Sequence, residues 1–543
     1  MRELGTSELL FTASREGVSS KARIGLSVRP PVPYRTTVQS GHLGRGKAEL
    51  QVARRLYPNF RELKGAVSTV PLALAHGLSQ YLNKYPFGCT EQLVSRAFAA
   101  LVLRKRPAFV AGTKEAERSV EEAIKILRAR QNPEGGFGFW AANSHVSPFQ
   151  AVYAMHFLTE LKDQGQPLGG DMMLRAQSYL DRLGAKDPRS LADARDSAYA
   201  LYILTRNGQI RTRGIQALHQ RLKTGSFKGW ELDLTAAYLA ASYSQLRMGA
   251  EAASLMSRMK LGDDQEPDYA NYYDSLRRDS QLLYLWANHF PDRLKRMAGA
   301  ELQGMADAIA KGSFNTITSA YTILAFDAYA SRVGEPADQG VGVHQTIGDK
   351  EEFPIPLARG LLPAFGFSEN ADRLKFDNPG PQPVFYQAAQ AGFDLNPPTR
   401  PVKEKLEVHR ELRNADGKNA SEAAVGEVLT VVFRIRSLSR SSHSNIAVVD
   451  LLPSGFEPIR NPENPAFDGA RLAVAGSTWR PEHEDIREDR VILFGSVGED
   501  AQEFRYSIRA VNAGTYILPP AYAESMYDRS VQARSVGGSL TVR

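Results

Sequence analysis

A cysteine and a glutamine three positions apart are the two side chains of this sequence best suited to bond with each other. Cys89, the single cysteine among 543 residues, precedes Gln92 in the segment KYPFGCTEQL, at the start of a helix predicted over residues 91–104. Positions i and i+3 of a helix share one face, with Cβ atoms about 5–6 Å apart, so the sulfur can reach the Gln92 carbonyl carbon. Attack of a thiolate on this amide, with loss of ammonia, would form an internal thioester.

The position of Cys89 at a helix start favours this chemistry. The dipole and the free backbone N–H groups of a helix N-terminus stabilise a thiolate. Glu91 stands between the two reacting groups and is the candidate for moving protons during thioester formation or aminolysis. The alternative is that Cys89 is a small buried apolar side chain, and a redox role lacks a second cysteine.

Bulky side chains immediately upstream could shield such a bond. A thioester reacts with amines and hydroxyls and hydrolyses slowly where water reaches it, so its storage requires burial. Tyr85 and Phe87 flank Pro86 and offer apolar cover, although both rings could equally serve the core of the first helical hairpin. Gly88 permits a close backbone approach that a side chain would obstruct. The sequence therefore predicts a thioester shielded by Tyr85 and Phe87.

The composition argues against several other kinds of site. One cysteine forms neither an intrachain disulfide nor a multi-thiolate centre, and the ten histidines show no HExxH or HxxxH spacing, so no metal or cofactor is predicted. The net charge of +7 is spread without a Lys/Arg block, which argues against nucleic-acid binding. No stretch approaches the roughly 20 apolar residues of a membrane helix. The first residues lack a secretory signal, which predicts either a cytoplasmic protein or a fragment.

A helical region must position the reactive pair. Between about residues 65 and 332, apolar side chains recur with the helical period in about twelve segments of roughly 10–18 residues. These segments pair across short turns with Gly or Pro, as in 147–163 with 171–183 and in 277–290 with 294–311. About six such hairpins favour closure into an α/α toroid, with a straight solenoid as the alternative.

The residues before and after the helices have the pattern of β-strands. Apolar and polar residues alternate over 22–28, which predicts a strand with one buried face, ended by the prolines that follow. Beyond about residue 336, EEFPIPL and PGPQPVFYQAAQAGFDL are strand candidates, and the two regions could be halves of one sandwich. Residues 396–402 are predicted as a linker, and the alternation beyond them predicts an immunoglobulin-like sandwich over 403–543.

One segment resembles a known protein family. GCTEQ matches the GCxEQ thioester motif of alpha-2-macroglobulins and complement components, and YPFGCTEQLVSRAF is similar to the bacterial branch. QAGFDLNPPTRPV, VVDLLPSGFE and AESMYD also resemble bacterial alpha-2-macroglobulins, so the resemblance covers essentially the whole chain. It implies an α+β multidomain fold. An α/α-toroid thioester domain over 63–335 would be inserted in a CUB-like β-sandwich split between 1–62 and 336–398, followed by a macroglobulin-like, receptor-binding-type sandwich over 403–543.

The resemblance also implies roles for individual residues. Cys89 and Gln92 would be the thioester pair, Glu91 the motif acid, and Tyr85 the aromatic side chain that shields the unreacted bond. In the family, a protease cuts an upstream bait region, and the exposed thioester then acylates a lysine of that protease. This reaction is a single-turnover acyl transfer by an endopeptidase inhibitor and not turnover catalysis.

The resemblance further implies partners and a location. Proteases held through a lysine are the expected partners of a monomeric, periplasmic protein that is often lipid-anchored, and some full-length members act beside a cell-wall synthase. The sequence contains no bait region, so this chain alone is not expected to trap proteases. Some complement members first pass the acyl group to a histidine. None of four histidines aligns with that site, so reaction with amines is expected: His76, His145, His156 and His219.

Two other functions remain open from the sequence. The first is a noncovalent interaction module in which no thioester forms. The second is a toroid enzyme acting on lipids or glycans, because the Gly-rich segment 131–140 (QNPEGGFGFW) resembles turns of terpene cyclases and prenyltransferases. Such an enzyme would need an Asp-rich segment at the mouth of the toroid. The candidate is GDDQEPD at 262–268, whose proline-bearing context favours a solvated acidic turn.

Overall fold

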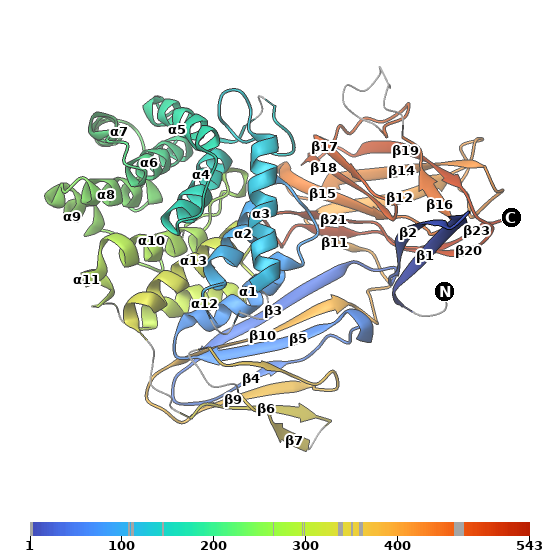
Figure 1. Cartoon of the computed structure of the whole chain (residues 1–543), viewed down its shortest axis with the longest axis horizontal. Helices are drawn as coiled ribbons and strands as arrows, with labels where there is room; N and C mark the ends of the chain where they lie inside the picture. The colour runs from blue at the N-terminus through green and yellow to red at the C-terminus, as the bar shows by residue number, and fades with distance from the viewer. Residues whose placement is uncertain are drawn as a thin grey trace. The chain divides into compact units, whose positions relative to one another are not determined.

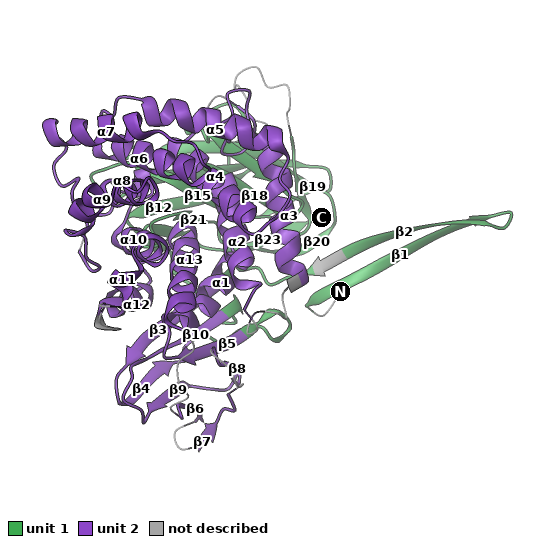
Figure 2. Cartoon of the chain, turned by 60° about the vertical axis from the view of Figure 1, so that its left-hand side comes forward, with its two compact units in different colours: residues 1–35, 54–62, 391–543 green, residues 36–53, 63–390 purple. Residues whose placement is uncertain are grey.

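The computed structural model describes most of the chain as two compact units, which Figure 2 colours separately. One unit comprises residues 1–35, 54–62 and 391–543, and the other comprises residues 36–53 and 63–390. The described residues are 4–543 except for 107–108, 110–112, 144–145, 264, 296, 298, 335–339, 349–350, 358–361, 461–471 and the side chains of 26–27, 113 and 299–300. The helices and the Cys89 segment belong to the second unit.

The helices of the second unit form a closed ring of two layers (Figure 1). The inner layer consists of α2 (Thr90–Leu103), α4 (Pro148–Asp163), α6 (Leu191–Arg206), α8 (Leu234–Gln245), α10 (Ser275–His289) and α13 (Thr316–Val333). The outer layer consists of α1 (Ala75–Asn83), α3 (Thr113–Arg130), α5 (Gly170–Ala185), α7 (Thr212–Thr224), α9 (Gly249–Met256), α11 (Pro291–Leu294) and α12 (Gln303–Ala310). Each inner helix packs against the next, and α13 packs against α2. The predicted α/α toroid is confirmed, and the solenoid alternative is wrong.

The last outer segment departs from the prediction. A single helix was expected over 294–311, but α11 ends at Leu294, and a 3-10 helix (Gly299–Leu302) precedes α12. Outer helices such as α7 show the helical period clearly because they bury one stripe. Thus α7 buries Ile215, Leu218 and Leu222, whereas α8 of the inner layer is buried from Leu234 to Tyr243 on every side.

One rim of the toroid carries the first turns of all six inner helices, because the inner and outer helices alternate in direction. Five of these helices begin with a polar side chain that accepts a hydrogen bond from a backbone N–H of the first turn: Ser147, Ser190, Asp233, Asp274 and Asn315. Such N-caps contribute about 1 kcal/mol each. The sixth helix, α2, has Cys89 as its N-cap. We call this end of the ring the N-terminal rim.

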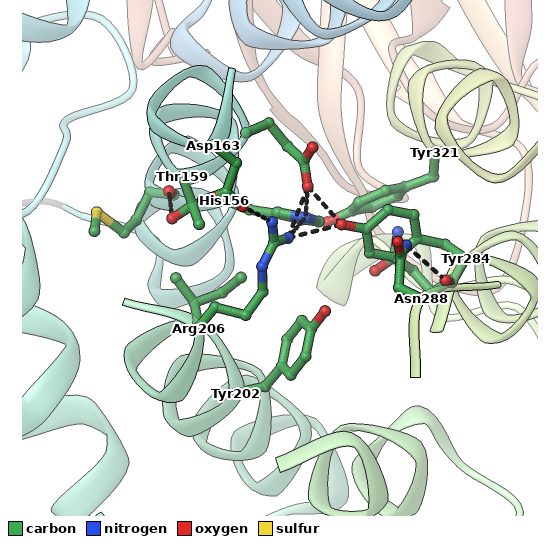
Figure 3. A network of polar contacts seen from close by, with 12 residues as sticks. His156, Thr159, Asp163, Tyr202, Arg206, Tyr284, Asn288 and Tyr321 are labelled. Atoms are coloured by element: carbon green, nitrogen blue, oxygen red, sulfur yellow. Dashed lines mark hydrogen bonds and ion pairs between the residues drawn. The ribbon is translucent and has the colours of Figure 1, made fainter. Parts of the chain in front are cut away.

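The interior of the ring contains a buried polar network toward the other rim (Figure 3). Glu160 accepts hydrogen bonds from Arg206 (2.7 Å) and from the Tyr284 hydroxyl (2.5 Å), which joins α4, α6 and α10. Burial alone would raise the pKa of Glu160, but Arg206, His156 and Tyr284 together lower it below its usual range. A buried charge needs this kind of pairing to be tolerated, so the network is part of the structural core.

Two four-stranded sheets flank the helices in the sequence. Their strand orders are β3-β10-β5-β8 and β4-β9-β6-β7. The bounds are β3 (Tyr34–Leu43), β4 (Gly46–Gln51), β5 (Glu62–Ser68), β6 (Gly342–Ile347), β7 (Glu351–Pro354), β8 (Ala364–Gly366), β9 (Arg373–Asn378) and β10 (Val384–Phe393). Val67 of one sheet shares a buried core with Leu374 and Phe376 of the other. The helices are therefore inserted between strands of one sandwich, as predicted.

The first strands of the chain form a separate ribbon. β1 (Gly5–Arg15) and β2 (Val18–Val28) pair antiparallel as a two-stranded sheet. The strand predicted over 22–28 is therefore present, but its predicted buried face is wrong for Ala22 and Ile24, which are exposed. Alternation gives a strand two unlike faces, but within the described residues this ribbon has no third strand to widen it into a larger sheet.

The C-terminal region is a β-sandwich, as predicted. Its sheets have the orders β11-β22-β21-β15-β18-β17, β12-β14-β19-β16 and β13-β23-β20. The bounds are β11 (Val402–Glu404), β12 (Leu406–Arg413), β13 (Glu422–Ala423), β14 (Val428–Ser437), β15 (His443–Leu451), β16 (Phe456–Pro458), β17 (His483–Ile486), β18 (Arg490–Val497), β19 (Gln502–Ala510), β20 (Gly514–Leu518), β21 (Tyr522–Ser525), β22 (Gln532–Arg534) and β23 (Gly538–Val542). Phe433, Val448 and Trp479 lie in its shared core. In the described part of the chain, no helix combines the length and apolarity needed to span a membrane.

Candidate thioester site

Cys89 and Gln92 lie together in the first turn of α2. Cys89 is the N-cap with extended backbone angles (φ −66°, ψ 166°), and Gln92 occupies the third helical position. The two residues form a capping box, in which the Cys89 side chain faces the backbone N–H of Gln92, and the Cys89 backbone N–H donates to Gln92 Oε1 (3.0 Å). Cys89 is 0% and Gln92 2% exposed. The structure thus brings the predicted pair together in a buried setting.

The capping box also gives the Gln92 side-chain carbonyl oxygen a backbone donor. When a nucleophile adds to the Gln92 side-chain carbonyl carbon, the negative charge develops on Oε1. The Cys89 N–H that already donates to this oxygen would stabilise that charge. Because the donor is a backbone group fixed at a helix start, it needs no rearrangement as the charge forms.

The predicted shielding residues form one aromatic cluster next to this turn. Tyr85 packs edge to face against Phe87 and against Tyr81, with ring centroids 5.4 Å apart in both pairs. Tyr81 in turn packs against Phe314 (5.1 Å). Phe87 is buried, whereas Tyr85 is partly exposed. The cluster therefore contains both a core residue and a ring at the surface, and the shielding role of Tyr85 stays a prediction.

Glu91 faces the interior of the ring. Its Oε1 accepts a hydrogen bond from Ser95 (2.5 Å), and its Oε2 accepts one from Thr316 at the start of α13 (3.0 Å). Ser95 also contacts the Tyr153 hydroxyl (2.8 Å). Glu91 therefore links α2 to α13 where the ring closes, a structural role that sequence analysis missed. Its predicted part in proton transfer stays a prediction.

A turn far along the chain holds the start of α2. Thr90 donates its backbone N–H to Phe139 O (3.0 Å) and its hydroxyl to Gly138 O (2.6 Å). Arg130, the last residue of α3, donates to Gly88 O from both terminal nitrogens (3.3 and 3.2 Å). The Gly-rich segment 131–140, likened above to turns of toroid enzymes, thus holds in place the helix start that carries the candidate thioester.

Two glycines explain the composition of this turn. A Cβ at Gly135, where φ is +89°, would lie 2.0 Å from Arg175 O. A Cβ at Gly138 would lie 1.8 Å from Ala141 O. Neither position accepts a side chain without backbone movement, so the glycines are required for the loop path that presents the carbonyls of Gly138 and Phe139 to Thr90. The glycines of segment 131–140 were the sequence feature that could have indicated this turn.

Arg130 brings a positive charge to the site. Burial lowers the pKa of Arg130, and the opposing attraction of an ionised Cys89 raises it, with a net lowering. The attraction is mutual, so the same charge stabilises a thiolate at Cys89. Sequence analysis did not single out Arg130, because its 42-residue separation from Gly88 leaves no local pattern.

Three of the four histidines considered above contact aromatic residues. His156 contacts the Tyr199 hydroxyl (2.6 Å) and lies in the network of Figure 3. His76 stacks on Phe109 (4.1 Å), and His219 contacts the Tyr243 hydroxyl (3.1 Å). His145 lies outside the described residues.

The acidic segment 262–268 has structural contacts. Asp263 pairs with Arg278 (3.2 Å) and Lys260 (3.3 Å), and Asp268 caps a 3-10 helix, whereas residue 264 is not among those described. Over the described residues, no group of three or more His, Cys, Asp or Glu side chains is arranged to hold a metal ion.

The fold is that of the alpha-2-macroglobulins. A crystal structure of native alpha-2-macroglobulin from Escherichia coli, spanning domain MG7 to the C-terminus, superimposes with a TM-score of 0.78 at 20% identity, covering 100% of this chain and 88% of that one. Salmonella alpha-2-macroglobulin reacted with methylamine gives a TM-score of 0.77 at 20% identity, covering 99% of this chain and 36% of that one.

Sequence comparison places the chain more narrowly. Residues 406–529 match the family described as the bacterial alpha-2-macroglobulin MG10 domain. An alpha-2-macroglobulin homolog of Yersinia pestis is 34% identical over 560 aligned positions, which cover 98% of this chain and 28% of the relative. The chain belongs to the bacterial alpha-2-macroglobulin family, and it spans little more than a quarter of that relative's length.

Proposed function

We propose that this chain is the thioester-bearing portion of a bacterial broad-spectrum protease inhibitor, which captures an attacking protease by transferring an acyl group to one of its lysines. The observation that carries the proposal is the buried capping box of Cys89 and Gln92. It brings a thiol and an amide into one helical turn and aims a backbone N–H at the carbonyl oxygen. The match of GCTEQ to the family motif supports the same pair.

The bond would form in one substitution. The Cys89 thiolate adds to the side-chain carbonyl carbon of Gln92, and the negative charge on Oε1 is held by the Cys89 N–H. The C–N bond then breaks, and the nitrogen takes up the proton that the thiol gave up and leaves as ammonia. The carbonyl is restored as a thioester between Sγ and the former amide carbon.

Transfer to a target is the reverse type of substitution. A neutral lysine amine adds to the same carbon, the C–S bond breaks with its electron pair on sulfur, and the proton lost by nitrogen passes to the sulfur or to water. The product is an amide between Gln92 and the target, with Cys89 released as a thiol. Each molecule reacts once, so the proposed activity is inhibition by single-turnover acyl transfer.

The relatives support the proposal and indicate its setting. The Salmonella alpha-2-macroglobulin of the same fold was reacted with methylamine, and we propose the same amine reactivity here. The trigger would be a bait region cut by the protease, and this region would lie in the part of the relatives' length that this chain does not span. A periplasmic location, a monomeric state and action beside a cell-wall synthase belong to the same proposal.

Intact mass tests the covalent chemistry. A formed thioester lowers the mass by about 17 Da, the mass of ammonia, and methylamine adds to the acyl carbon while releasing one thiol. We expect the mass deficit before methylamine and a full thiol titre after it. A full mass and a full thiol titre before amine treatment would overturn the covalent proposal and leave the noncovalent interaction module as the better reading.

A further inference from the structure

Arg130 is the charged side chain that the structure places against the turn carrying Cys89. Besides its two hydrogen bonds to Gly88 O, it donates from Nη1 to Thr90 Oγ1 (3.0 Å) and to Phe139 O (3.1 Å). One guanidinium therefore joins the residues on either side of Cys89 to the Gly-rich turn. No carboxylate in the described part of the chain forms an ion pair with Arg130, so its charge stays available to the sulfur.

We propose that Arg130 is a positioning residue for the thioester. It fixes the turn from Gly88 to Thr90 against segment 131–140, and it supplies the positive charge that stabilises the Cys89 sulfur whenever that sulfur is a thiolate. This inference deepens the proposed function and rests on it for its role in acyl transfer. Its electrostatic part concerns the thiol alone.

A thiolate occurs at two moments of the proposed chemistry. It is the nucleophile when the bond to Gln92 forms, and it is the leaving group when a target amine displaces it. For loading, a fixed positive charge raises the fraction of Cys89 that is present as the thiolate nucleophile. For discharge, it lowers the barrier because charge develops on the leaving sulfur and the fixed charge need not reorganise at the moment of reaction. Arg130 should therefore promote both the loading of the site and its discharge.

Arginine has the geometry for both tasks. Its planar guanidinium presents several N–H donors at fixed directions, which suits the three acceptors around Arg130, whereas lysine offers one compact charge on a flexible stem. Arg130→Lys retains charge and loses part of the bridge, and Arg130→Gln loses the charge. Arg128 lies two positions earlier on α3 and is exposed, so Arg128→Gln is the matched control for removing a positive charge from this helix.

The experiment uses the full chain and its three variants. Intact mass first gives the loaded fraction, and methylamine-dependent thiol release then gives the discharge rate. Alkylation of the Cys89 thiol by iodoacetamide between about pH 5 and 9 gives the midpoint of thiolate formation. We expect Arg130→Gln to release thiol about tenfold more slowly and to shift the alkylation midpoint upward. Arg128→Gln should match the wild type, and Arg130→Lys should keep the midpoint while loading less completely.

A folded Arg130→Gln variant with the wild-type release rate and alkylation midpoint would overturn the inference. If Arg130→Gln does not fold, the Lys variant decides, because a midpoint raised to that of the unfolded chain would contradict a role for the charge. A wild type without a mass deficit would end the proposed function alone. The alkylation midpoints would still test Arg130, since the thiol is then titrated without methylamine.

Discussion

Two neighbouring helices of the ring begin with the same geometry and different chemistry. α13 starts with a capping box in which Asn315 accepts from the Thr318 N–H (3.0 Å) and donates its own N–H to Thr318 Oγ1 (2.8 Å). α2 starts with the equivalent box made of Cys89 and Gln92. A common helix start becomes a candidate reactive site when the cap is a thiol and the third residue carries an amide.

A cysteine N-cap stabilises a helix less than an asparagine N-cap, and the two helix starts show what compensates for the difference. A thiol accepts hydrogen bonds more weakly than an amide oxygen, so Cys89 is a poorer cap than Asn315. α2 is held from outside instead, by Arg130 and by the carbonyls of Gly138 and Phe139 on Thr90. The difference indicates that the Gly-rich turn replaces the stability that the cap does not supply.

Replacing the two caps should separate chemistry from stability. Cys89→Ser should abolish both the mass deficit and the methylamine-dependent thiol, with a small change in unfolding free energy, because serine is a preferred N-cap. Asn315→Ala should cost about 1 kcal/mol in urea unfolding and leave the mass deficit intact. A mass deficit that survives in Cys89→Ser would contradict the assignment of the bond.

Shielding should affect only the α2 start. Tyr85→Ala removes the partly exposed ring of the aromatic cluster, so water should reach the thioester and the mass deficit should decay several-fold faster at constant pH and temperature. Tyr85→Phe, which keeps the ring, is the control. Equal decay rates for the Ala variant and the wild type would show that other groups shield the bond.

The first residue of each helix is a threonine, Thr90 in α2 and Thr316 in α13, so the same substitution can be compared at both positions. Thr316→Val removes the hydrogen bond to Glu91 and leaves a buried carboxylate with one donor fewer, which should cost about 2 kcal/mol of unfolding free energy. Thr90→Val removes the bond to Gly138 O and should cost about 1 kcal/mol. The Thr90 variant should in addition react faster with methylamine. Faster reaction of the Thr316 variant instead would place the control of reactivity at the ring closure.

The smallest effect is expected at Asp274, an N-cap that carries an ionisable group. Burial raises the pKa of Asp274, the N-cap of α10, to about 6, against hydrogen bonds from the first turn that lower it. A raised folded-state pKa means that stability is present at low pH and is lost as the pH rises through about 6. Asp274→Asn should therefore be more stable than the wild type by about 1 kcal/mol at pH 8, and the difference should vanish near pH 4. A difference that is independent of pH would contradict this assignment.

Sequence reasoning reached features that depend on short separations. The Cys89–Gln92 spacing, the helix start, the hairpins and the strands of the C-terminal sandwich all lie within windows where a period or a motif is visible. The contacts of Arg130 with Gly88 and of Glu91 with Thr316 span 42 and 225 residues, and no local pattern encodes them. The exposure of Ala22 and Ile24 in β2 was also not predictable, because alternation shows that a strand has two unlike faces but not whether another layer covers one of them.

The closing contact between Glu91 and Thr316 also sets an order of events during synthesis. The cysteine turn emerges early, but the helix that completes its surroundings is made 225 residues later. Contacts so distant in sequence form late in folding, because the loop between them must first be closed. The last of the contacts described at the start of α2 can therefore form only after nearly the whole ring has been synthesised.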